Sequence, residues 1–197
     1  IMILPILAYG TSVLKQRANE IDKNYIDLNS IIRNMWDTMY NANGVGLAAP
    51  QIGLSIRVFI IDTSSYEYEE NLDTNEIEKL KDFKQVFINP KILEQSEKEW
   101  IFNEGCLSIP DIRGDINRSQ SIKIKYFDEK FNEKTESFSG LIARVILHEY
   151  DHIEGILFTD KLSPLRRKIL QGRLQNIYKG KIDTNYPMSF FKQVNRK

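Results

Sequence analysis

Apolar side chains recur every three or four positions along residues 27–43. Positions with this spacing share one face of an α-helix, and such a face is normally buried against a core. The pattern therefore predicts an amphipathic helix, which Asn43 and Gly44 are expected to end. Its buried face would consist of Leu28, Ile31, Ile32, Met35, Trp36 and Met39.

Shorter apolar segments later in the chain have the pattern of β-strands. Residues 57–62 form a compact apolar run, and residues 121–128 alternate between apolar and polar side chains. Residues 85–96 are a further predicted strand, and the turn-forming segment 128–134 makes residues 135–140 the expected partner of 121–128. Strands interrupted by helices, without a repeating β-α-β order, favour an α+β fold with antiparallel sheets.

Two more helices are predicted in the second half of the chain. Residues 141–154 have helical spacing and carry both histidines. Ser163 and Pro164 are typical of a helix start, so a third helix is expected from there to about residue 179. The predicted fold is therefore α+β, with antiparallel β-sheets packed around the central histidine-bearing helix, and with one N-terminal and one C-terminal helix.

Composition narrows the class of protein. The chain has 197 residues, 42% of them hydrophobic, which suits a single globular domain over residues 1–197. Its 27 basic and 27 acidic residues balance, which argues against bulk binding of nucleic acid, and no apolar run approaches the roughly 20 residues that span a bilayer. A single cysteine favours a reducing compartment, and the first residues lack the pattern of a signal peptide, so we expect a cytoplasmic protein.

Charge is spread unevenly along this neutral chain. Residues 66–82 hold seven acidic residues and two lysines, and we expect an exposed hairpin or loop insertion there. Residues 161–197 hold ten lysines and arginines and one acidic residue. That end of the chain is suited to contact a polyanion, although a solvated basic helix explains the same pattern. No pattern predicts the path of residues 181–197, which we treat as a C-terminal extension.

Both histidines lie in the sequence LHEYDHIEG. His148 and His152 would share one helical face and could hold one metal ion together, which would make the central helix a metal-binding helix. Glu149 would reach a water at that ion without binding the ion, so it is the candidate general base. One class of zinc proteases adds a third histidine six positions after the second. Phe158 occupies that position here, and its side chain cannot bind a metal.

Three side chains remain as candidates for the third ligand: Cys106, Asp160 and Asp183. A lone cysteine is more often a small buried hydrophobe, but Cys106 lies in NEGCLSIP, where glycine and proline suggest a special backbone shape. Two histidines and one cysteine would leave a fourth position for water, as in catalytic zinc-type sites. With Asp160 or Asp183 instead, the chain would be a metallopeptidase, and with a fourth protein ligand it would be a structural metal module.

The segment GVGLAAPQIG, residues 44–53, offers groups that could stabilise an oxyanion. Its glycines allow the backbone to approach a substrate closely, and Gln51 carries an uncharged amide donor. A glycine-rich turn between the first helix and the strand 57–62 explains the same residues without a role in catalysis. The segment matches neither of the phosphate-binding glycine motifs.

The three segments GVGLAAPQIG, EGCLSIP and HEYDHIEG, in this order, resemble the signature motifs of the peptide deformylase family. The resemblance extends from ILPILAYG near the start to LFTDKLSP near Pro164. It implies an enzyme that removes the formyl group from the N-terminal formylmethionine of nascent polypeptides and releases formate. It also implies one divalent metal, usually ferrous iron, with zinc, nickel or cobalt able to replace it.

The resemblance implies a role for each matching residue. Glu149 would transfer the proton, while Gln51 and the backbone N–H of Leu107 would polarise the formyl oxygen. The substrate backbone would pair as an extra strand beside Val45 and Gly46. The metal ligands would be Cys106, His148 and His152. The methionine pocket would be lined by Val45, Leu141, Val145 and His148, with Gly105 and Arg113 as further substrate contacts.

Two segments depart from the shortest members of that family, namely the acidic residues 66–82 and the extension 181–197. In some bacterial members a C-terminal extension docks on the ribosome, and the basic excess after residue 161 is compatible with such a contact. Organellar members carry a targeting extension that this sequence lacks. We therefore expect a bacterial-type cytoplasmic enzyme acting on formylmethionyl peptides, with neither a membrane nor specific DNA as a partner.

Overall fold

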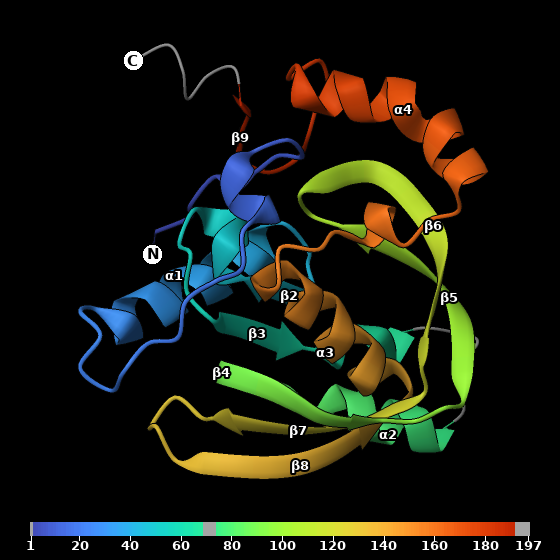
Figure 1. Ribbon diagram of the computed structural model, residues 1–197. Coiled ribbons are helices and arrows are strands. Elements are labelled where there is room, and N and C mark those ends of the chain that lie inside the picture. The colour runs from blue at the N-terminus through green and yellow to red at the C-terminus, as the bar shows by residue number, and fades with distance from the viewer. Residues whose placement is uncertain (1, 69–73, 192–197) are drawn as a thin grey trace.

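The computed structural model describes residues 2–68 and 74–191 (Figure 1). Its strands are β1 (Ile6–Leu7), β2 (Gly46–Ala48), β3 (Val58–Asp62), β4 (Lys84–Gln95), β5 (Glu99–Cys106), β6 (Ile109–Ser119), β7 (Ser121–Phe127), β8 (Glu133–Ser139) and β9 (Met188–Ser189). Its α-helices are α1 (Leu28–Asn41), α2 (Thr74–Lys81), α3 (Gly140–Ile153) and α4 (Pro164–Tyr178). Short 3-10 helices lie at η1 (Ser12–Lys15), η2 (Ala49–Ile52), η3 (Ser64–Tyr68) and η4 (Phe158–Asp160). The class is α+β, as predicted.

A five-stranded antiparallel sheet with the order β2-β3-β4-β7-β8 forms the base of the structure. Its strand β3 is a continuous apolar run because both of its faces are buried. Val58 and Ile60 pack in the same cluster as α1, whereas Phe59 and Ile61 pack in the cluster that contains α3. The two helices thus cover opposite faces of the sheet.

Helix α3 lies between this sheet and the β5–β6 hairpin (Figure 1). It contacts β2 and β3 on one side and β6 on another. Ten of its fourteen residues are buried, including the charged or polar Arg144, Glu149, Asp151 and His152. Burying such groups costs free energy unless they are hydrogen-bonded or paired. A helix that buries several of them is therefore expected to hold them in a polar network or to use them in a functional site.

The β5–β6 hairpin was not predicted from the sequence. Its strands pair from Glu99 with Ser119 to Cys106 with Ile109, so only residues 107–108 connect them. The buried positions of β6 do alternate, but Gly114 and Arg118 occupy two of them, which conceals the apolar pattern. The hairpin brings Cys106 to its tip.

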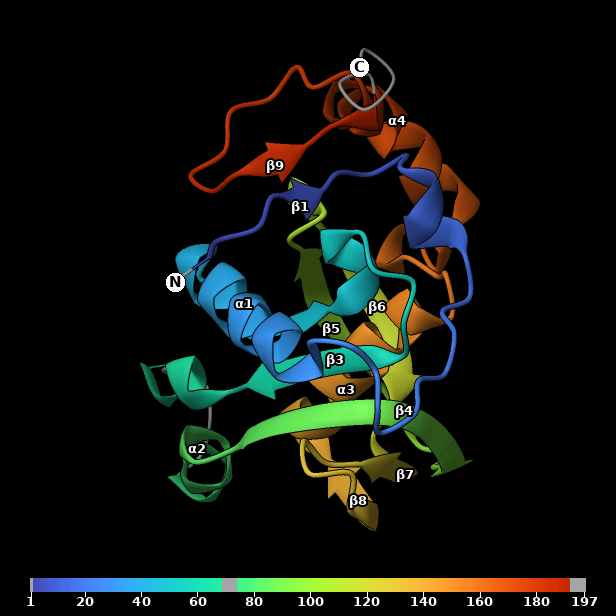
Figure 2. The same ribbon diagram turned by 90° about the vertical axis from the view of Figure 1, so that its left-hand side faces the viewer.

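Two expectations about the chain need correction. The described part of residues 66–82 contains helical turns and not the strands of a hairpin, because η3 ends at Tyr68 and α2 spans residues 74–81, with Leu80 buried. That this segment is an insertion stays a prediction. The stretch 69–73 lies outside the described residues. The sheets are not all antiparallel either, because β9 pairs with β1 in parallel (Figure 2). This pairing joins the two ends of the chain, which local sequence patterns do not reveal; residues 192–197 also lie outside the described part.

The predicted helices agree with the structure to within about two residues at either end. Ser163 caps α4, since its Oγ accepts a hydrogen bond from the backbone N–H of Arg166 at 3.3 Å. None of the helices in the described residues is long and apolar enough to cross a membrane.

The end of α3 offers a test of this packing. Gly155 has φ +74°, and a Cβ atom there would lie 2.8 Å from the carbonyl carbon of Lys15. Gly155→Ala should lower the free energy of unfolding by about 2 kcal/mol, because alanine is strained at this φ and the N-terminal segment would have to move. Gly172→Ala is the matched control, since a Cβ on this exposed face of α4 meets nothing within 4 Å.

Gly172→Ala should raise the free energy of unfolding by about 0.5–1 kcal/mol, because alanine is a better helix former than glycine. Urea unfolding of the three proteins measures both changes. Equal stability of the two variants would contradict the packing of Gly155 on the N-terminal segment.

Candidate metal centre

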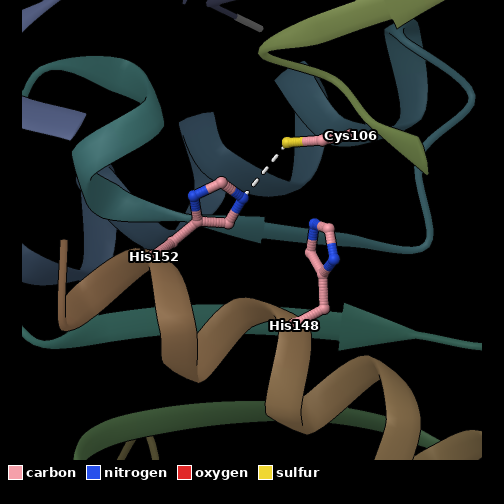
Figure 3. A group of neighbouring side chains, drawn as sticks. All are labelled: Cys106, His148 and His152. Atoms are coloured by element: carbon pink, nitrogen blue, oxygen red, sulfur yellow. Dashed lines mark hydrogen bonds between the residues drawn. The ribbon is translucent and has the colours of Figure 1, made fainter. Parts of the chain in front are cut away.

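Two histidines of α3 and the cysteine at the tip of the β5–β6 hairpin converge on one point (Figure 3). The Nε2 atom of His152 lies 3.2 Å from Sγ of Cys106, and the ligand atoms of Cys106, His148 and His152 all lie within 4.8 Å of one another. Four ligands arranged around zinc or a similar ion lie about 3.5 Å apart, so this spacing suits a shared ion. Within residues 2–68 and 74–191, no other three side chains of these types converge in this way.

The other two proposed third ligands lie elsewhere. Asp160 accepts a hydrogen bond from the backbone N–H of Leu157 at 2.8 Å and pairs with Lys15. Asp183 is exposed in the segment after α4. Neither aspartate belongs to the converging group, so the geometry favours the cysteine.

The carboxylate of Glu104 orients the first histidine. Its Oε2 lies 3.0 Å from Nδ1 of His148, which leaves Nε2 of that ring free to bind an ion. Histidine ligands commonly use their second ring nitrogen in this way, which sets the tautomer and the ring direction. This contact, together with a donor set of two imidazoles and one thiol, fits zinc or ferrous iron.

Glu104 is itself held by two buried arginines. Arg118 donates to both of its oxygens at 2.7 and 2.9 Å, and Arg144 donates to Oε1 at 2.9 Å. Burial alone would raise the pKa of Glu104, but the hydrogen bonds from Arg118 and His148 hold it well below the usual range. The group therefore stays ionised and remains a strong acceptor for the His148 ring.

No sequence pattern predicted this charged cluster. Arg118 also donates to Oδ2 of Asp151 at 2.5 Å, and Arg144 donates to the backbone carbonyl of Trp100 at 2.6 Å. The arginines thus tie β5, β6 and α3 together behind the metal centre. One signal was available in the sequence, because Glu104 directly precedes the Gly-Cys pair.

Glu149 lies beside the converging ligands with its side chain buried. Its Oε2 has no hydrogen-bond partner among the described residues. A Cβ atom on Gly46 would lie 2.5 Å from its Oε1, so only glycine leaves room for the carboxyl group. Burial raises the pKa of Glu149 to about 7, and a cation bound nearby would lower it. A carboxyl group in this state can accept a proton from water and return it.

Gln51 directs its amide donor at the hairpin tip. Its Oε1 accepts the backbone N–H of Ala48 at 2.8 Å, which fixes the orientation of the amide. Its Nε2 then lies 3.2 Å from Oγ of Ser108 and 3.6 Å from Sγ of Cys106. A neutral donor therefore faces the hairpin tip that carries Cys106.

A cavity of about 790 Å³ opens in front of these groups. Its wall includes all the residues that the sequence analysis assigned to the substrate, together with Gln51, Leu107 and Glu149. Phe102, Arg144 and Tyr186 also line the cavity, and no sequence pattern had pointed to them. The predicted substrate residues in the wall are Val45, Gly46, Gly105, Arg113, Leu141 and Val145.

Comparisons with known proteins agree on one family. The family model for polypeptide deformylase matches residues 3–168. A peptide deformylase of Christiangramia forsetii is 57% identical over 189 residues, which is 96% of each chain, and one of Flavobacterium psychrophilum is 54% identical over 187 residues, which is 95% of this chain and 96% of the relative.

Solved structures give the same result. A peptide deformylase from Legionella pneumophila has a TM-score of 0.76 at 34% identity, covering 91% of this chain and 97% of the other. A Plasmodium falciparum peptide deformylase in complex with an inhibitor has a TM-score of 0.74 at 30% identity, covering 88% and 99% of the two chains. The chain therefore belongs to the polypeptide deformylase family, whose members remove the formyl group from the N-terminal methionine of nascent peptides.

Proposed function

We propose that Cys106, His148 and His152 hold one divalent metal ion for this deformylation, with ferrous iron as the native ion. The observation that carries the proposal is the convergence of these side chains, with His148 oriented by Glu104. A thiolate with two imidazoles binds ferrous iron and also accommodates zinc, nickel or cobalt. We assign residues 1–197 to one catalytic domain. We place the protein in the cytoplasm, where a reducing environment keeps a lone cysteine reduced.

In the proposed reaction, water adds to the formyl carbon, and the bond from that carbon to the methionine nitrogen breaks. When bound, the metal ion supplies the Lewis acidity that makes water a stronger nucleophile. Glu149 accepts the proton of the attacking water and delivers it to the leaving amine, so the products are formate and a free N-terminus. The buried position of Glu149, with one carboxyl oxygen that has no hydrogen-bond partner among the described residues, supports both transfers.

Negative charge develops on the formyl oxygen during the attack. Gln51 Nε2 and the backbone N–H of Leu107 are the proposed donors to this oxygen. Gln51 is suited to the role because its amide is already fixed by Ala48 and needs no reorganisation during the reaction. Leu107 follows the cysteine ligand directly, so its N–H belongs to the peptide group beside the metal centre.

The peptide substrate would bind along the open edge of the five-stranded sheet. Strand β2 is an edge strand of that sheet. Gly46 in β2 and Val45 just before it can therefore pair with an extended peptide. Arg113 donates to the side chain and carbonyl of Asn103 at 2.8 and 2.5 Å, which holds it beside Gly105 in the cavity wall. The methionine side chain would enter the pocket formed by Val45, Leu141, Val145 and His148.

The exposed face of α4 is the proposed contact with the ribosome, a polyanion. Its cationic side chains include Arg166 and Lys168, and two apolar residues beside them, Leu165 and Ile169, are 70% and 62% exposed. Such a surface suits RNA phosphates, which lysine and arginine neutralise.

The proposed metal ligands are tested by Cys106→Ala. Its metal content should fall from one ion per chain towards zero, and formate release from a formyl-Met peptide should drop by more than about a hundredfold, because a ligand contributes more than its outer-shell partners do. Elemental analysis and a coupled formate assay measure the two quantities. Asp183→Ala, the control for the alternative ligand, should keep both. Metal retained by Cys106→Ala together with cleavage of internal peptide bonds would indicate the metallopeptidase instead.

The proton-transfer role of Glu149 is tested by Glu149→Gln, which keeps the size of the side chain. We expect kcat to fall by about a hundredfold to ten-thousandfold at unchanged metal content, because the amide cannot accept the proton of water. Glu154→Gln serves as the control. Glu154 follows the end of α3, and its carboxylate pairs with Arg17 and Arg57. A Glu149→Gln enzyme within tenfold of the wild type would rule out this assignment.

Charge reversal tests the ribosome contact. The double variant Arg166→Glu/Lys168→Glu should co-sediment with ribosomes at least about tenfold less than the wild type, since two phosphate contacts become repulsive. Deformylation of a free peptide should stay unchanged. Lys123→Glu/Lys125→Glu on β7 makes the same change in net charge as control. Equal co-sedimentation of both double variants would contradict a contact through α4.

A further inference from the structure

The segment after α4 returns to the metal centre. Strand β9 pairs with β1 (Figure 2), and Tyr186 lies two residues before β9 in the chain. The Tyr186 side chain forms part of the same cavity wall as Cys106 and Glu149. Its hydroxyl donates a hydrogen bond of 2.9 Å to the backbone carbonyl of Leu107. A residue of the C-terminal extension thus contacts the turn that follows the proposed cysteine ligand.

This turn consists of two residues, Leu107 and Ser108, and each is held from outside the hairpin. The carbonyl of Ser108 accepts the backbone N–H of Tyr9 at 2.9 Å, and its Oγ lies 3.2 Å from Nε2 of Gln51. The carbonyl of Leu107 is held by Tyr186. Three segments from distant parts of the sequence therefore fix the turn: the N-terminal segment, the η2 segment and the C-terminal segment.

The hydrogen bond to the Leu107 carbonyl bears on the direction of the Leu107 N–H. The two groups belong to the peptide units on either side of one Cα atom, so only φ and ψ of Leu107 separate them. Fixing the carbonyl restricts both rotations, and an oxyanion donor works only when it points at the place where the charge develops. Without Tyr186 the turn would still be flanked by the paired strands β5 and β6. It would lose the hydrogen bond that orients Leu107.

The surroundings of Tyr186 suit a permanent donor. Its ring is half-buried and packs with Leu107 against the core cluster that includes α1. The Oγ1 of Thr184 donates to the Tyr186 carbonyl at 2.8 Å, which fixes the backbone at this point. Burial, together with the charges of Cys106 and Asp111, raises the pKa of Tyr186 above its usual range, so the hydroxyl keeps its proton.

We propose that Tyr186 is a positioning residue for deformylation, which aims the backbone N–H of Leu107 at the formyl oxygen through its hydrogen bond to the Leu107 carbonyl. This inference rests on the proposed role of Leu107 as an oxyanion donor. It gives the C-terminal extension a task at the active site, separate from any contact that α4 makes with the ribosome.

Tyr186→Phe tests the proposal, because it removes the hydroxyl and keeps the ring in the cavity wall. We expect kcat for a formyl-Met peptide to fall by about three- to tenfold, the loss that corresponds to one neutral hydrogen bond. KM and the inhibition constant of the deformylated product should stay within about twofold, because the product has no formyl oxygen. Tyr178→Phe is the matched control: its ring stacks on Phe191, and the residue is not among those that line the cavity.

Two readouts do not depend on turnover. Metal content should equal that of the wild type, and amide hydrogen exchange of the segment 105–109 should be at least about threefold faster in Tyr186→Phe but unchanged in Tyr178→Phe. Faster exchange with a lower kcat at constant KM supports the positioning role. Unchanged kcat and exchange would overturn it, and so would a parallel loss of metal, KM and product affinity, which would show a general support of the cavity. A wild-type enzyme that releases no formate would instead contradict the proposed function itself.

Discussion

The carboxylate of Glu104 is the point on which the geometry of the centre depends. It lies on β5, two residues before the proposed cysteine ligand, and it contacts His148 on α3 and two arginines from β6 and α3. Because these charged groups are buried, each depends on the others to compensate its charge. Removing one partner would leave an unpaired buried charge, at a cost of about 3–5 kcal/mol. The hairpin and the helix therefore cannot shift relative to each other without breaking this cluster.

This constraint explains how a soft ligand from a hairpin meets two histidines from a helix. The ligands are only as well placed as the elements that carry them, and a rigid supporting shell is what keeps such a site in its working geometry. On the opposite side, the Leu107–Ser108 turn is held by Gln51, Tyr9 and Tyr186. The charged cluster thus orients His148, while neutral hydrogen bonds hold the donors proposed for the oxyanion.

Local patterns predicted the parts of the fold that bury one regular face. The helices around Met35 and His148 follow helical spacing, Ser163 and Pro164 mark the start of α4, and the alternation of Ile122, Ile124 and Tyr126 marks β7. The hairpin was missed because Gly114 and Arg118 occupy buried positions of β6 and interrupt its apolar pattern. The pairing of β1 with β9 was missed because it joins residues about 180 positions apart, for which two-residue strands give no local signal.

For the site, spacing alone predicted that His148, His152 and Glu149 act together, and the absence of a third histidine directed attention to Cys106. The supporting residues Glu104, Arg118 and Arg144 could not be found in this way, because each is separated from its partners by at least 14 positions, and charged residues are normally exposed. Tyr186 was equally hidden, since only the tertiary fold brings the end of the chain to the hairpin tip.

X-ray absorption spectroscopy at the metal edge of the enzyme loaded with ferrous iron under anaerobic conditions tests the central claim most directly. We expect one sulfur atom and two imidazole nitrogens in the first coordination shell, with a remaining position filled by oxygen. A first shell without sulfur, or one closed by a fourth protein ligand, would contradict the assignment of Cys106, His148 and His152 as an open catalytic centre.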